Sequence, residues 1–215
     1  MTKITNISSI KSLYKNSLPT FLYACLRYWE YPRLERIEKM IPKKGIILDL
    51  GSGYGIFSNY LAARSNKRKV IALEFNKKKI HIAEKAAKDI NIKNILFTQK
   101  DILNIDIPKA DVIILMHVLH HVGDREKQKQ LISDCVKKLK SGGMLLIDEV
   151  EYKFSLKQVL VFLADTIFYL GDKFHYRTRK DMENILKALS LKVEAHNVDG
   201  YLMPFPELVY LCKKL

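Results

Sequence analysis

Short apolar runs alternate with amphipathic stretches along most of the chain. Residues 46–50 form a continuous apolar run, which is typical of a strand buried on both faces of a sheet. The later apolar runs are similar, and each is followed by a stretch with helical spacing or by a turn. Ser141, Gly142 and Gly143 predict the end of a helix and a turn. We predict strands at 46–50, 70–73, 95–98, 111–116 and 144–150, and helices at 56–65, 77–88 and 124–139. This alternation indicates a parallel sheet with helices on both faces.

The two ends of the chain depart from this alternation. Residues 9–40 have helical spacing that is broken at Pro19 and Pro32, because proline removes a helix donor. A helix is predicted from Thr178 to about residue 189, with Asp181 as the capping-box partner. The last two predicted strands, 191–198 and 207–212, have a connection too short for a parallel crossover. The predicted fold class is therefore α/β: a Rossmann-like, doubly wound, seven-stranded, mostly parallel sheet with a reversed C-terminal strand and a helical N-terminal extension.

Composition and charge exclude few classes of protein. A chain of 215 residues that is 48% hydrophobic can form one α/β domain with a full core. The three cysteines are far apart and form no metal-binding pattern, so we expect a reducing compartment and no metal site. We also expect no signal peptide and no membrane span. The net charge of +14 would suit a nucleic acid or an anionic membrane, but lysine is spread along the whole chain, which favours a compositional origin.

The glycine-rich loop after the first predicted strand indicates a ligand site. Gly51, Gly53 and Gly55 lie where an open parallel sheet binds its ligands, and glycine lets a ligand approach the backbone closely. Glu74 ends the second predicted strand, where a carboxylate can accept hydrogen bonds from ribose hydroxyls. Together these features indicate a cofactor that contains adenosine.

Three departures from the dinucleotide-binding pattern distinguish among such cofactors. The glycine spacing is GxGxG instead of GxGxxG. Asp49 lies beside the loop, where it would repel a pyrophosphate but attract an ammonium or a sulfonium group. Asp101 follows the third predicted strand and is placed to accept a hydrogen bond from an adenine amino group. Three carboxylates at successive strand ends therefore suit a cationic adenosine ligand without phosphates.

The segments ILDLGSGYG, ALEFN, QKDIL, ADVIILMHVLHHV and LKSGGMLLIDE, in this order, resemble the class I S-adenosylmethionine-dependent methyltransferase family, in its small-molecule branch. The resemblance implies S-adenosyl-L-methionine as cofactor and S-adenosyl-L-homocysteine as product. It implies that Asp49 and the loop hold the methionine part, that Glu74 binds the ribose, and that Phe75 and Ile102 enclose the adenine. The implied cofactor residues are Asp49, Gly51, Ser52, Gly53, Gly55, Glu74, Phe75, Asp101, Ile102 and Met116.

The resemblance also implies a domain organisation. We expect an N-terminal helical extension that acts as a lid at 1–42 and a methyltransferase domain at 43–215, with an insertion at 152–175 as a substrate lid. The apolar segments 18–31 and 156–170 either pack on the sheet or also line an acceptor pocket. In the second case the acceptor is apolar or amphipathic, such as a lipid, a prenyl or quinone precursor, or a polyketide-like acid.

The histidines after the fourth predicted strand are the catalytic candidates. Methyl transfer requires positioning, and it requires a base only if the nucleophile starts protonated. The resemblance places the segment with His117, His120 and His121 against the cofactor's methyl group, and His117 is the first candidate for a base or a substrate contact. The alternative is that all three only pack and form local hydrogen bonds.

Acceptor contacts are predicted from separate segments of the chain. Arg177 either grips a carboxylate or phosphate or only supports the helix start. Asp148, Glu149 and Glu151 either orient the acceptor or form a solvated edge that pairs with lysines, and we favour the solvated edge. The candidate acceptor contacts are Tyr28, Trp29, Glu149, His175 and Arg177.

The sequence therefore predicts in-line methyl transfer from S-adenosylmethionine to a small, apolar or amphipathic acceptor. The alternatives are a nucleic-acid methyltransferase, which the absence of an NPPY or DPPY sequence after the fourth strand disfavours, and a cofactor-binding protein without turnover. An NAD-dependent oxidoreductase is disfavoured by the glycine spacing and by Asp49. We expect a cytoplasmic protein that contacts an anionic membrane surface transiently.

Overall fold

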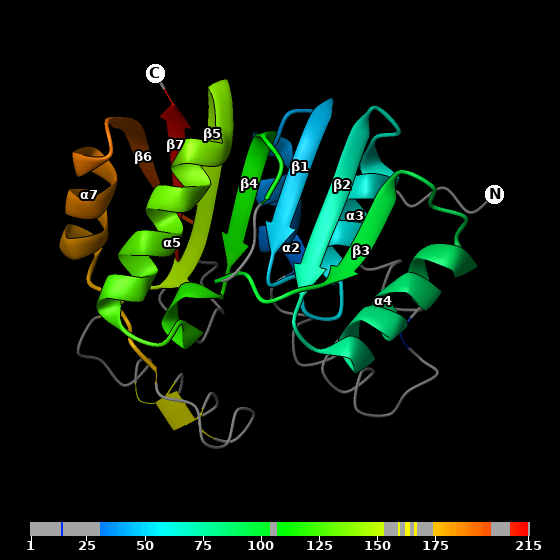
Figure 1. Cartoon of the computed structure of the whole chain (residues 1–215), viewed down its shortest axis with the longest axis horizontal. Coiled ribbons are helices and arrows are strands. Elements are labelled where there is room, and N and C mark those ends of the chain that lie inside the picture. Colours follow the sequence, from blue (N-terminus) through cyan, green and yellow to red (C-terminus); the bar gives the residue numbers. More distant parts are fainter. Residues whose placement is uncertain are drawn as a thin grey trace. The chain divides into compact units, whose positions relative to one another are not determined.

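The fold of this protein is a seven-stranded, mostly parallel sheet with a reversed C-terminal strand, as predicted. The computed structural model describes residues 14, 31–103, 107–152, 159, 162, 163, 166, 174–198 and 207–214. The chain divides into two compact units, Met1–Asp106 and Ile107–Leu215 (Figure 1). Within the described residues, no helix is both long and apolar enough to cross a membrane.

The first unit contains three parallel strands with β2 in the middle. Helix α3 packs on β2, and α4 packs on β3 and contacts α3. The strand β1 is buried from Ile47 to Leu50, which explains its continuous apolar sequence. The elements of this unit are α2 (Tyr31–Met40), β1 (Gly45–Leu50), α3 (Ile56–Arg64), β2 (Arg68–Glu74), α4 (Lys77–Asp89) and β3 (Ile95–Gln99).

A buried ion pair joins α2 to the first residue of β2. The guanidinium of Arg68 lies 2.7 Å from a carboxylate oxygen of Glu38, and both side chains are almost completely buried. Arg68 also donates hydrogen bonds to the carbonyl oxygens of Ile41, Pro42 and Leu61. These bonds satisfy the buried charge and fix the chain that leads into β1.

The second unit contains β4 and β5 in parallel and a C-terminal hairpin. Strand β7 runs antiparallel to both β5 and β6, so it is the reversed strand (Figure 1). Helix α7 packs on β6, and α5 packs on β5. The elements are β4 (Ala110–Met116), the 3-10 turn η3 (Leu119–His121), α5 (Arg125–Lys138), β5 (Leu139–Val150), α7 (Arg179–Ala188), β6 (Leu191–Asn197) and β7 (Glu207–Lys214).

The predicted start of α7 is confirmed, but the predicted turn before β5 is wrong. The hydroxyl of Thr178 accepts a hydrogen bond from the backbone N–H of Asp181. Strand β5 begins at Leu139, directly after α5, and continues through Gly142 and Gly143. The register with β4 shifts there, and Gly142 has a φ of 69°, so the glycines form an irregularity within a long strand.

Candidate functional site

The loop between β1 and α3 has a backbone that only glycine adopts easily at three positions. Gly51, Gly53 and Gly55 have φ values of 78°, 57° and 69°. The backbone N–H groups of Gly51 and Ser52 donate to the carbonyl oxygen of Leu73, at 2.8 and 2.9 Å. The loop is therefore fixed to the end of β2, and its conformation explains the glycine spacing in the sequence.

Two of these glycines have different surroundings. A Cβ atom on Gly55 would lie 2.6 Å from the Cβ of Ala83 and 2.7 Å from a ring carbon of Phe97. A Cβ atom on Gly53 would meet nothing within 4 Å. Gly55 is therefore required for the packing of the loop on α4 and β3, whereas Gly53 borders open space where a ligand can approach the backbone.

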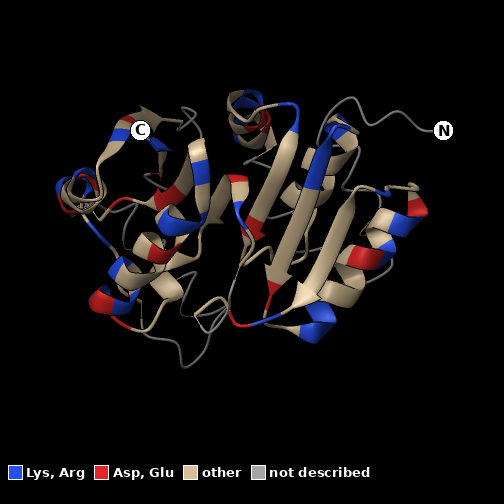
Figure 2. Cartoon of the chain, turned by 45° about the horizontal axis from the view of Figure 1, so that its top comes forward, with Lys and Arg blue, Asp and Glu red and all other residues tan. Residues whose placement is uncertain are grey.

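Carboxylates lie at the ends of β1 and β2, beside the loop (Figure 2). Asp49 is buried and accepts a short hydrogen bond from the hydroxyl of Ser58. Burial, together with the nearby charge of Glu74, raises the pKa of Asp49 to about 6. The carboxylate of Glu74 accepts hydrogen bonds from the backbone N–H groups of Gly53 and Asn76, at 2.9 and 2.8 Å. Two acidic groups thus lie beside the glycine loop, where a cation would stabilise them.

The remaining cofactor candidates of this unit also fit S-adenosylmethionine. Within the described part of the chain, the buried hydroxyl oxygen of Ser52 has no hydrogen-bond partner, so it is available to a polar ligand. The side chain of Phe75 is 73% exposed, which leaves its ring open to a flat base. Asp101 accepts a hydrogen bond from the backbone N–H of Leu103, and Ile102 is half-buried. Asp49 and Glu74 suit the ammonium group and the ribose hydroxyls respectively.

Asp49→Asn is expected to stabilise the ligand-free protein at neutral pH. The pKa of Asp49 is raised from 3.8 to about 6, so the folded state loses stability as the pH rises through this window and the buried group ionises. A shift of this size corresponds to at most about 3 kcal/mol. Urea denaturation should therefore show Asp49→Asn to be more stable than the wild type at pH 7.5, with a smaller difference at pH 4.5.

The same substitution should abolish binding of S-adenosylmethionine, because the amide cannot offer a negative charge to the ammonium group. Asp89→Asn, at an exposed aspartate that ends α4, is the control and should change neither property. A variant that is less stable than the wild type at pH 7.5 would show that the ionised carboxylate stabilises the loop.

In the second unit, a histidine and a buried glutamate form a dyad at the end of β4. The Nδ1 atom of His120 lies 2.6 Å from Oε2 of Glu149. The other oxygen of Glu149 accepts hydrogen bonds from the backbone N–H groups of Val118 and Leu119, at 2.8 and 2.7 Å. Both side chains are buried, and the ring of His120 stacks on Tyr176 with centroids 5.4 Å apart. The carboxylate therefore holds the imidazole in one orientation.

A buried polar network ties the segment before α7 to this dyad. Gln128 donates to the carbonyl oxygens of Leu119 and His175, at 2.7 and 2.9 Å, and accepts a hydrogen bond from Nε of Arg177. Arg177 also pairs with Asp181 and donates to the carbonyl oxygen of Arg125. These bonds favour the structural interpretation of Arg177, since its guanidinium is used within the protein.

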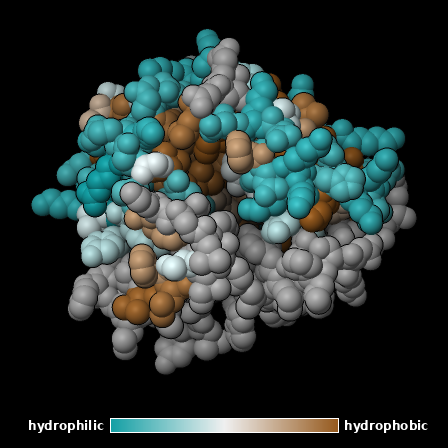
Figure 3. All heavy atoms as spheres, turned by 60° about the horizontal axis from the view of Figure 1, so that its bottom comes forward, coloured by the Kyte–Doolittle hydropathy of each residue, from teal (hydrophilic) through white to brown (hydrophobic). Residues whose placement is uncertain are grey.

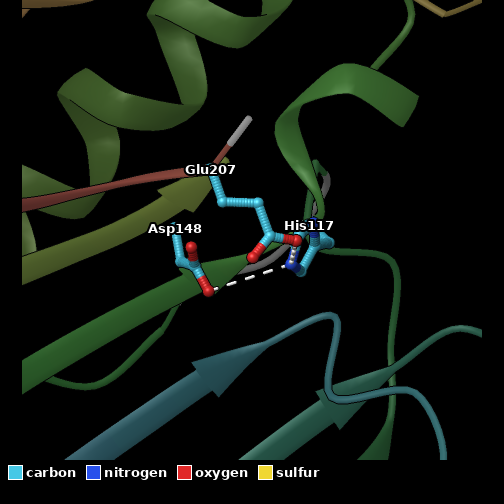
Figure 4. A group of neighbouring side chains, drawn as sticks. All are labelled: His117, Asp148 and Glu207. Atoms are coloured by element: carbon cyan, nitrogen blue, oxygen red, sulfur yellow. Dashed lines mark ion pairs between the residues drawn. The ribbon is translucent and has the colours of Figure 1, made fainter. Parts of the chain in front are cut away.

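A second cluster contains His117, three residues before His120, and Asp148, one residue before Glu149, together with Glu207 (Figure 4). The Nε2 atom of His117 is 3.4 Å from a carboxylate oxygen of Glu207 and 3.8 Å from one of Asp148. Asp148 and Glu207 are buried, and the side chain of His117 is 15% exposed. His117 has a φ of 52°, so the chain changes direction directly after β4.

The structure brings some of the predicted acceptor residues together and corrects one interpretation. Asp148 and Glu149 are buried and contact histidines, so the solvated edge predicted for them is wrong. The backbone N–H of His175 donates to the carbonyl oxygen of His120. His121 packs beside His120, with ring centroids 4.3 Å apart, and Met116 ends β4 half-buried. Tyr28 and Trp29 lie outside the described residues, as do most of the predicted lids at 1–42 and 152–175.

Glu207 is the functional candidate that sequence reasoning missed. It opens β7, and the only signal would have been the strand register, which pairs it with Val150 of β5. Side chains two residues apart on a strand share a face, and directly paired residues do as well. Glu207 therefore shares a face with Asp148, while Glu149 points to the opposite face.

Comparisons with known proteins find a matching family model and similar folds. Residues 47–143 match the family described as a methyltransferase domain. An O-methyltransferase family protein from Burkholderia thailandensis is similar in structure, with a TM-score of 0.74 and 16% identity over 98% of this chain and 63% of that chain. An O-methyltransferase family 2 protein from Planctomyces limnophilus, in complex with apigenin, has a TM-score of 0.71 and 18% identity over 97% of this chain and 62% of that chain.

Magnesium protoporphyrin IX methyltransferase from Synechocystis, with bound S-adenosylhomocysteine, has a TM-score of 0.72 and 16% identity over 99% of this chain and 97% of that chain. The present chain thus spans less than two thirds of each of the first two proteins and nearly all of the third. A comparison with curated protein sequences finds no match.

Proposed function

We propose that the chain is a class I S-adenosylmethionine-dependent methyltransferase that methylates a hydroxyl oxygen of a small, apolar or amphipathic acceptor; the match of residues 47–143 to the methyltransferase-domain family and the similar folds of solved methyltransferases support this. S-adenosylmethionine, when bound, supplies a methyl group already activated by its sulfonium centre. The protein's own tasks are then to hold the cofactor, to position the acceptor and to remove the acceptor's proton. The residues proposed to hold the cofactor are Asp49, Ser52, Gly53, Glu74, Phe75, Asp101, Ile102 and Met116.

The dyad of His120 and Glu149 is the observation that carries the proposal. Glu149 is fixed by two backbone N–H groups, so it accepts the proton on Nδ1 of His120 and leaves Nε2 as the basic nitrogen. A carboxylate that orients an imidazole in this way is the arrangement that general bases require. A hydroxyl nucleophile starts protonated, and this pair provides the group that would take its proton.

Aromatic side chains near the dyad support an apolar acceptor. The ring centroids of Tyr176 and Phe174 are 6.2 Å apart, and those of Phe174 and Phe162 are 6.5 Å apart. Together with the stacking of His120 on Tyr176, this forms a row of rings that leads away from the base. The side chains of Val159, Phe162 and Leu163 are about half exposed, and Figure 3 shows hydrophobic side chains at the surface of this unit. Such a surface favours flat or extended apolar acceptors.

Label transfer tests the proposed function. The protein is incubated with methyl-labelled S-adenosylmethionine and an extract of its native host, and the organic, small aqueous, protein and nucleic-acid fractions are separated. We expect label in the organic fraction. Gly53→Arg is the control: its side chain would occupy the open space beside the loop, so it should block cofactor binding.

Two outcomes would contradict the proposal. Label in RNA or DNA would identify a nucleic-acid methyltransferase and would give the net charge of +14 a function. No label above the Gly53→Arg control, from a protein that binds S-adenosylmethionine, would indicate a cofactor-binding protein without turnover.

A further inference from the structure

We propose that His117, Asp148 and Glu207 form a binding site for one divalent transition-metal ion. Each of the three residues offers one ligand atom, and these atoms all lie within 4.8 Å of one another. The proposal goes beyond methyl transfer, because the site has its own ligand and can be tested without an acceptor.

Three neighbouring elements bring the ligand atoms together. Asp148 lies near the end of β5, opposite Met116 of the parallel β4, and His117 follows directly. The backbone N–H of His117 donates to the carbonyl oxygen of Asp148 at 2.8 Å, which fixes the position of the imidazole relative to β5. Glu207 comes from β7 on the other side of β5 (Figure 4). The three side chains converge because β5, which carries Asp148, pairs with β4, which His117 follows, on one side and with β7, which carries Glu207, on the other.

The distances between these atoms suit a coordinated ion better than a direct contact. The Nε2 atom of His117 is 3.4 Å from Glu207 and 3.8 Å from Asp148. Hydrogen bonds from nitrogen to oxygen are usually about 2.9–3.0 Å long. Two ligand atoms that are each about 2.1 Å from a tetrahedral zinc ion are separated by about 3.4 Å. The observed spacing therefore leaves room for an ion between the imidazole and the carboxylates.

The charges point to the same type of ligand. Two carboxylates that are 0% and 1% exposed lie together, and buried carboxylates repel each other unless a cation balances them. A divalent ion balances both charges. The side chain of His117 is 15% exposed, so the site reaches the solvent on the imidazole side.

The combination of ligand atoms indicates the class of metal. One imidazole and two carboxylates suit zinc, manganese or iron(II), whereas calcium and magnesium prefer oxygen ligands alone. Three protein ligands leave at least one coordination position for water or for an oxygen of another molecule. A metal at this position would be separate from the base, since Glu149 serves His120 on the opposite face of β5.

Metal binding to the purified, metal-stripped protein tests the proposal. Isothermal titration with Zn²⁺, together with the visible absorption of Co²⁺ as a substitute ion, should show one equivalent bound. Glu207→Gln replaces a charged oxygen ligand by a neutral one, and His117→Gln removes the imidazole nitrogen, so each should weaken binding at least about tenfold. His196→Gln is the matched control, because His196 also lies near a glutamate, Glu194, but on an exposed part of β6. It should bind as the wild type does.

Two results would overturn the site. If Zn²⁺ binds equally well to the wild type, Glu207→Gln and His117→Gln, the ion binds elsewhere. If the wild type is folded by circular dichroism but binds no Zn²⁺, the three residues do not form a metal site. Because no acceptor is used, either result is independent of the label-transfer experiment.

Discussion

Gly55→Ala is expected to lower the free energy of unfolding by about 2 to 5 kcal/mol. A residue with a Cβ atom at a φ of 69° costs roughly 1–2 kcal/mol, and forcing extra volume into a packed site costs roughly 1–3 kcal/mol more. The added atom would lie 2.6 Å from Ala83 and 2.7 Å from Phe97, both of which are buried. Neither contact is with the end of a flexible side chain, so α4 or β3 must move.

Gly53→Ala is the matched variant, because its φ of 57° is similar but its Cβ atom would meet nothing within 4 Å. It should cost only the roughly 1–2 kcal/mol of backbone strain. Urea denaturation of both variants measures the difference, and titration with S-adenosylmethionine measures the effect on the ligand. Gly53→Ala should remain folded but bind the cofactor more weakly, since the new methyl group lies in the open space beside the loop. Equal losses of stability would mean that α4 adapts to Gly55→Ala.

The glycine loop and carboxylates of the first unit could be predicted from the sequence because most of these residues are close together in the chain. Asp49, the glycines and α3 follow one another directly, so a strand, a turn and a helix in this order define the geometry. Glu74 could be placed because parallel strands end at the same edge of a sheet. The role of Gly55 in packing could not be predicted, because it depends on how α4 and β3 approach the loop.

The histidine and carboxylate clusters of the second unit depend on strand register, which the sequence does not specify. Asp148 and Glu149 are neighbours in the chain, yet they point to opposite faces of β5 and contact different histidines. Glu207 joins Asp148 only through the antiparallel pairing of β7 with β5. The preferred candidate for the base also changes from His117 to His120. His117 is nearest to the end of β4, but the turn η3 places His120 against Glu149.

His120→Gln is expected to lower kcat by about 10² to 10⁴, the usual contribution of a general base. Glutamine can still donate a hydrogen bond to Glu149 but cannot take a proton from a hydroxyl group. The affinity for S-adenosylmethionine should not change, because the proposed cofactor residues of the first unit are untouched. Initial rates of methyl transfer to the organic-soluble acceptor fraction, and separate cofactor titrations, measure the two quantities.

Two further variants show whether the effect comes from the dyad. Glu149→Gln keeps an oxygen for the backbone N–H groups of Val118 and Leu119 but turns an amide N–H toward Nδ1 of His120. This favours the imidazole tautomer with its proton on Nε2, so kcat should fall between those of the wild type and His120→Gln. His81→Gln changes an exposed histidine of α4 and should leave the rate unchanged. A His120→Gln protein that turns over at nearly the wild-type rate would exclude this base. The acceptor would then be one that needs no proton removed, such as a carboxylate or an amine that is already neutral.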